Sequence, residues 1–141
     1  MKSSIQILPG IKAVGWVDCR HLPRRVDLTG ICRMPVAILT DIHPIVFFGD
    51  VDCSCKSTKN SAGYEDTASL KFLAAEELPH GVAVGFVVTD VNDKSFLIGS
   101  QESPHPTIEC EHRKGAPSGD SAGVYYEIKH VALKSLIPCT I

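Results

Sequence analysis

The sequence lacks most of the features that identify a class of protein at first reading. Its apolar runs, such as Ile45 to Phe48 and Val82 to Val88, are far shorter than the roughly 20 residues of a membrane-spanning helix. Ser3, Ser4 and Gln6 interrupt the start of the chain, where a secretory signal needs an unbroken apolar segment. We therefore expect no membrane partner, no export signal and a cytoplasmic location.

Charge of one sign is also scarce. The formal net charge is −2 over 141 residues, which provides no general field to attract nucleic acid. No Gly-rich phosphate loop and no nucleotide-binding fingerprint is present. Hydrophobic residues make up 44% of the chain, as in soluble globular proteins. We expect one folded domain over residues 1–141, with no nucleic-acid partner and no cofactor.

Cys-x-x-Cys pairs, the usual zinc signature, are absent, although the chain has six cysteines. Without an export signal, we expect free thiols. Two weaker pairs remain, Cys53-x-Cys55 and Cys110-x-His112, and residues two apart on a strand share a face, so two such strands could present these four ligands to zinc. Buried cysteine also behaves as a small hydrophobe. We expect no metal site, and these four residues are the candidates if one exists.

A complete catalytic signature is missing as well. The string from Gly119 to Gly123 resembles the Gly-Asp-Ser-Gly-Gly nucleophile motif of trypsin-like serine proteases and differs at Ala122. That nucleophile needs a histidine base, a buried aspartate and an oxyanion hole, and too few residues follow Ser121 to complete the family's second barrel. Gly, Asp and Ser before a strand are also typical of a turn. We therefore expect no enzyme activity and no catalytic residue.

Turn signals are frequent, and the segments between them alternate as half-buried strands do. Two segments place these residues on their inner faces: Val51, Cys53, Cys55 and Ser57 in one, and Ile108, Cys110 and His112 in the other. Val82 to Thr89 is apolar on both faces, which is typical of a strand buried on both sides. Val82 to Asp90 and Lys94 to Ile98 form a predicted hairpin. The sequence predicts a mainly β chain: an antiparallel β-sandwich or partly open barrel with at most one or two short helices.

One segment gives conflicting signals. Thr67 to Leu78 consists of strong helix formers and is followed by Pro79 and Gly81, which favours a helix. Its first half nevertheless alternates between apolar and polar residues. We predict a strand to about Leu73, because pairing within a sheet often overrides propensity.

The second half of the chain resembles a known group of proteins. The residues that carry the resemblance are Phe86 to Ser100, Pro104-His105-Pro106, Gly119-Asp120 and the strand Val124 to His130, with a looser match at Gly10 to Val14 and Asp18-Cys19. Together they cover about half of the chain and are similar to small phage and prophage tail-associated proteins of gut bacteria. The resemblance implies a structural subunit that builds or caps a tail tube or its neck.

The implied partners are further copies of the chain and other phage structural proteins, in an assembled virion particle. We expect a homo-oligomeric ring, in which copies meet head-to-tail at exposed strands near Gly10 to Asp18 and Gly123 to Leu133. The predicted contact residues on these strands are Trp16, Tyr125, Tyr126 and Val131. A small metal- or ligand-binding β module is the second hypothesis, and a serine hydrolase that uses Ser121 is the third.

Overall fold

The computed structural model describes residues 10–26, 32, 36–38, 41–61, 63–79, 81–102, 105–114 and 123–140. Strands dominate this part of the chain, and none of its helices is long and apolar enough to cross a membrane. The elements are β1 (Ile11–Asp18), the 3-10 helix η1 (Cys19–His21), β2 (Val36–Ala37), β3 (His43–Pro44), β4 (Phe47–Asn60), β5 (Gly63–Ala74), β6 (Val84–Asp90), β7 (Ser95–Ile98), β8 (Thr107–Arg113), β9 (Gly123–Ala132) and β10 (Ile137–Thr140).

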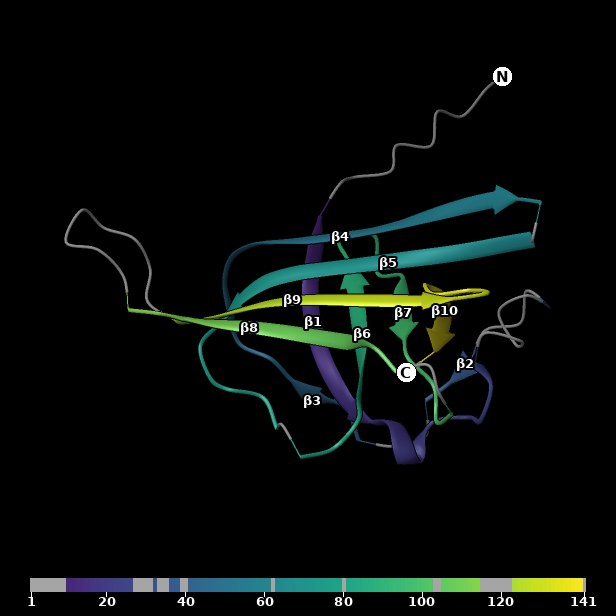
Figure 1. Cartoon of the computed structure of the whole chain (residues 1–141). Coiled ribbons are helices and arrows are strands. Elements are labelled where there is room, and N and C mark those ends of the chain that lie inside the picture. The colour runs from purple at the N-terminus through teal and green to yellow at the C-terminus, as the bar shows by residue number, and fades with distance from the viewer. Residues whose placement is uncertain are drawn as a thin grey trace, which may run out of the picture.

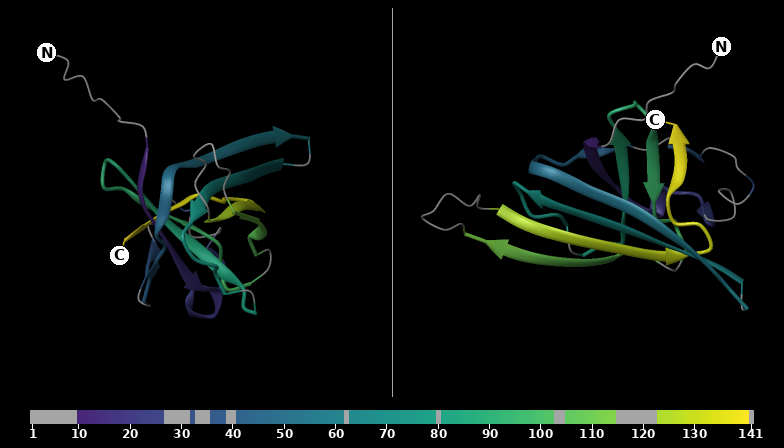
Figure 2. Two further views of the ribbon diagram at one scale, coloured as in Figure 1. Left: turned by 90° about the vertical axis from the view of Figure 1, so that its left-hand side faces the viewer. Right: turned by 90° about the horizontal axis from the view of Figure 1, so that it is seen from above.

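These strands form two sheets that pack face to face (Figures 1 and 2). Sheet A has the strand order β2-β10-β7-β6-β1-β3, and sheet B has the order β4-β5-β9-β8. Neighbouring strands run antiparallel, apart from β10 and β2, which are parallel. The strands of sheet B run across those of sheet A, as in orthogonally packed sheets (Figure 1). The predicted mainly β, antiparallel sandwich is confirmed.

The main hydrophobic core fills the space between the sheets. Its largest side chains, each at most 1% exposed, are Leu70, Phe72, Phe86, Ile98, Tyr126 and Ile128. A second cluster covers the opposite face of sheet A, where Leu22 and Val26 pack with Val87 and Leu97. Both faces of β6 are therefore buried from Val84 to Val88, which confirms this part of the prediction, whereas Val82 and Ala83, at the predicted start, precede the strand and are exposed.

β5 occupies the segment for which propensity and pattern conflict. It is a strand as far as Ala74, one residue past the predicted end. Ala68, Leu70 and Phe72 alternate into the core, while β4 and β9 pair with the strand on its two sides. Tertiary pairing in the middle of a sheet therefore overrides helix propensity here.

The inner face of β8 is more exposed than predicted. Cys110 lies opposite the buried Tyr126 in the ladder, so the predicted face is correct, yet both Cys110 and His112 are exposed. The reason is the position of β8 at the edge of sheet B, where its end extends beyond the strands of sheet A (Figure 1). Ser57, near the far end of β4, is exposed in the same way.

The alternation in β5 leads to a direct test of the fold. Leu70→Ala should lower the free energy of unfolding by about 2–5 kcal/mol, because it leaves a cavity in the main core. Ser69→Ala changes the neighbouring side chain, which lies on the outer face, and should alter stability by about 0.5 kcal/mol or less. Urea unfolding followed by tryptophan fluorescence measures both. Equal losses from the two variants would contradict the strand.

Candidate functional site

Sheet B has a free edge at each end, and these edges form the candidate functional site. Within the described residues, β8 pairs with β9 alone and β4 pairs with β5 alone. An edge strand presents a row of unpaired backbone N–H and C=O groups, to which a strand of another chain can bind. Such a site would bind through backbone hydrogen bonds, and the edge side chains would favour or oppose the binding of the second strand.

β8 is a regular edge. Its ladder with β9 continues without a bulge from Thr107 to Arg113, and the strand contains no proline. Proline and bulges are two of the devices that blunt an edge, and charge is a third. β8 does carry charged residues, which are Glu109, Glu111 and Arg113. The guanidinium of Arg113 lies 3.8 Å from the Glu111 carboxylate and 4.2 Å from the centre of the Tyr125 ring.

β4 is the longer of the two edges. Its register with β5 is irregular between Phe48 and Asp52 and continuous from Asp52 to Asn60. The first half of β4 carries Asp50 and Asp52 and its second half carries Lys56 and Lys59, so this second half is basic, whereas β8 carries Glu109 and Glu111 together with Arg113. Opposite charge favours pairing between strands that lie side by side.

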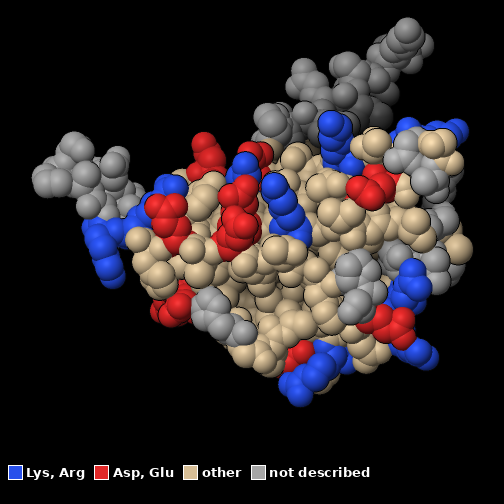
Figure 3. Space-filling model, viewed as in Figure 1, with Lys and Arg blue, Asp and Glu red and all other residues tan. Residues whose placement is uncertain are grey.

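The outer face of sheet B, between the two edges, carries charges of both signs. Lys71 and Glu127 lie opposite each other on β5 and β9, with 3.7 Å between Nζ and Oε1. The ladder places Asp52 next to Lys71 and Glu109 next to Glu127, so a row of charged side chains crosses all four strands. Acidic and basic side chains are interspersed on the face shown in Figure 3.

The predicted contact residues do not lie on free edges. β9 lies between β5 and β8, and β1 lies between β6 and the short β3. The side chain of Tyr126 is buried in the main core, which excludes it from a surface contact, while Trp16 is half-buried and stacks on His43 at 4.2 Å. Tyr125 is half-buried on the outer face of sheet B, where Val131 is 44% exposed.

The zinc candidates are divided between the two edges. Cys53 and Cys55 lie on β4, whereas Cys110 and His112 lie on β8, so three strand spacings of about 4.8 Å each separate the pairs. His112 instead places its Nε2 3.5 Å from Oε1 of Glu77. In the described part of the chain, no group of three or more His, Cys, Asp or Glu side chains is arranged to hold a metal ion.

The cysteines differ strongly in their surroundings. All six are free thiols. Burial raises the pKa of Cys19, Cys53 and Cys139 to about 11. Cys32 and Cys110 are exposed. Because the thiolate is the nucleophile, these two are the accessible reactive thiols.

Ser121 and its neighbours Gly119 and Asp120 lie outside the described residues. Comparison with protein-family models, with curated proteins and with solved structures finds no match for this chain. The candidate site therefore rests on its own geometry, which is the pair of strands that end sheet B in the described part of the chain.

The cysteine environments predict a pattern of alkylation. At pH 8, iodoacetamide should modify Cys32 and Cys110 much faster than Cys19, Cys53 and Cys139, because a pKa of about 11 leaves little thiolate and burial limits access. The rate at the buried group should rise as the pH is raised toward 11. Peptide mass spectrometry measures each site, and the unfolded protein is the control, in which all sites should react alike. Equal rates in the folded protein would contradict the burial.

Proposed function

We propose that this chain is a structural subunit of a phage-derived tail assembly, in which copies associate by adding β8 of one copy to β4 of the next. The observation that carries the proposal is that, within the described residues, the same four-stranded sheet has two edge strands with long regular stretches, Asp52 to Asn60 on β4 and Thr107 to Arg113 on β8. Backbone hydrogen bonds would supply the affinity, and the side chains would set the register.

Strand direction supports this mode of association. Each neighbouring pair in sheet B is antiparallel, so β4 and β8, separated by two strands, run in opposite directions. A copy placed beside the sheet in the same orientation therefore brings its β4 antiparallel to β8. The antiparallel pattern of the sheet continues across the contact without interruption.

The contact joins two different surfaces of the subunit. Such heterologous contacts close into rings when the rotation between copies allows it, and otherwise they build open filaments. A ring or a tube is the kind of assembly that the sequence resemblance implies for a tail protein. A contact between identical edges would instead stop at a dimer.

The resemblance and the edges support different parts of the proposal. The resembling segments Phe86 to Ser100 and Val124 to His130 include most of β6, all of β7 and most of β9, which are interior strands. They therefore support a shared core and the assignment to phage tails. Association through β8 and β4 rests on the free edges themselves.

Proline variants test the contact. Along an edge strand, successive backbone N–H groups point alternately toward the neighbouring strand and toward solvent. Glu111 and His112 are successive residues of β8, so a proline at one of these positions removes an N–H that points to solvent. A proline at the other removes a hydrogen bond to β9. The variant that keeps the wild-type melting temperature is the outward one. We expect wild-type protein to form concentration-dependent oligomers in light scattering and the outward proline variant to remain monomeric.

The matched controls are Glu111→Ala and His112→Ala, which keep both N–H groups. His112→Ala should associate as the wild type does, and Glu111→Ala, which also removes a carboxylate from β8, should still associate at a higher protein concentration. A wild-type monomer into the high micromolar range would contradict self-association. Oligomers that form equally well in the outward proline variant would show that the contact lies elsewhere.

A further inference from the structure

β8 carries its carboxylates and its arginine on the outer face of sheet B. These residues are Glu109, Glu111 and Arg113. Because successive side chains of a strand alternate between its faces, Cys110 lies on the inner face, opposite the buried Tyr126.

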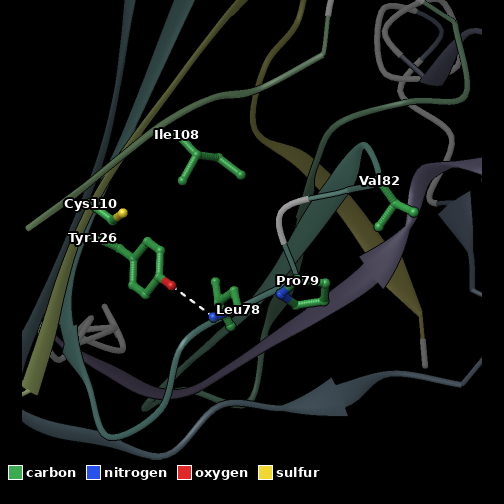
Figure 4. Close-up of a pocket in the computed structure, with 6 residues that line it drawn as sticks. All are labelled: Leu78, Pro79, Val82, Ile108, Cys110 and Tyr126. Atoms are coloured by element: carbon green, nitrogen blue, oxygen red, sulfur yellow. Dashed lines mark hydrogen bonds between the residues drawn. The ribbon is translucent and has the colours of Figure 1, made fainter.

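Figure 4 shows this inner side of β8. Cys110 lines a pocket of about 180 Å³ there, and its free thiol is exposed. The other lining residues are Leu78, Pro79, Val82, Ile108 and Tyr126. The backbone N–H of Leu78 donates to the Tyr126 hydroxyl, at 2.7 Å between nitrogen and oxygen, which holds the connection after β5 beside sheet B.

β4 divides its residues between the two faces in the same way. Asp52 lies opposite Lys71 on the outer face, and Lys56 alternates in step with Asp52. Cys55 lies opposite the buried Ala68, on the inner face. Each edge strand therefore carries charges of both signs on its outer face and a cysteine on its inner face.

The length of the regular stretches leaves two registers for the proposed contact. The regular part of β4, from Asp52 to Asn60, is slightly longer than β8. Antiparallel pairing of all of β8 with this part, outer face matched to outer face, places Glu109 opposite either Lys56 or Thr58.

Charge distinguishes these two registers. The first pairs Glu109 with Lys56. It also brings Arg113 opposite Asp52, so that two pairs of opposite charge form and no like charges are opposed. In the second register one such pair remains, between Glu111 and Lys56.

The inner face favours the same register. The second register places Lys59 opposite the half-buried Ile108, whereas the first places Ser57 there. A lysine opposite an apolar side chain gains no partner for its charge, so the first register fits both faces better.

We propose that β8 of one copy meets β4 of the next in the register that sets Glu109 opposite Lys56. Cys110 then lies opposite Cys55 of the next copy, on the inner side of the contact. This inference rests on the proposed assembly and specifies which residues meet in it.

The two cysteines make the register measurable. Directly opposed residues of antiparallel strands have Cα atoms about 4.5–5.5 Å apart, which a disulfide can span. Cys53 lies diagonal to Cys110 in this register, at about 7–8 Å, near or beyond the limit of a disulfide. Within one copy, three strand spacings of about 4.8 Å separate Cys55 from Cys110, so a disulfide between these two residues joins two copies.

Oxidation with diamide tests the register. The protein carries Cys32→Ser, which removes a second exposed thiol, and is kept at a concentration at which light scattering shows association. Diamide takes up the two hydrogens that a pair of thiols loses as the S–S bond forms. Mass spectrometry of the peptides should find the Cys55–Cys110 disulfide several-fold more abundant than Cys53–Cys110, and non-reducing gels should show a ladder of oligomers.

Ser57→Cys in a Cys55→Ser background is the matched control, because it offers Cys110 the partner of the second register. Its cross-link to Cys110 should be several-fold weaker. Lys56→Glu should lower the Cys55–Cys110 yield several-fold, and addition of Glu109→Lys should restore it, because the charge pair is then reversed.

The register and the assembly can fail separately. Association without the Cys55–Cys110 disulfide, an equal yield from the Ser57→Cys control, or a yield that the reversed charge pair does not restore would each overturn the register and leave strand addition in place. A protein that stays monomeric into the high micromolar range would overturn the assembly, and the register with it.

Discussion

The burial of one face of sheet B against sheet A is the constraint on which the rest of the structure depends. Leu70 and Phe72 on β5, with Tyr126 and Ile128 on β9, are almost completely removed from water by this contact. Because β5 and β9 supply these residues, they occupy the middle of the sheet, and β4 and β8 become its edges. The polar residues that alternate with these apolar ones along β5 and β9 lie on the outer face of sheet B, which faces solvent.

β8 contributes to both features of this edge, because its backbone groups and its inward side chains face different neighbours. Within the described residues, one side of its backbone pairs with no other strand, while Ile108 and Cys110 line the pocket. The hydrogen bond between Leu78 and Tyr126 contributes to both features, because it fixes the connection after β5 against the sheet that β8 borders. A buried hydrogen bond of this kind is costly to break, since a lone N–H would remain in the core.

Local patterns in the sequence were sufficient for the longer strands, and insufficient for the short strands β2, β3 and β10 and for the order of the strands. The period-two alternation of Ala68, Leu70 and Phe72 identified β5 despite its helix formers, and the apolar run of β6 indicated burial on both faces. Edges depend on which strands pair over long separations, so β9 was mistaken for an edge and Tyr126 for a contact residue. The alternating charges at Glu109 and Glu111 were the available signal for an exposed strand.

Hydrogen–deuterium exchange of the backbone amides, followed as the protein concentration is raised, tests the central claim that copies join through β8 and β4. Association should slow exchange along both edge strands together, because their outward N–H groups gain partners. Exchange in β5 and β9, whose amides already lie in the interior ladders, should stay the same. Association that leaves the edge amides unprotected, or that protects only sheet A, would contradict the account.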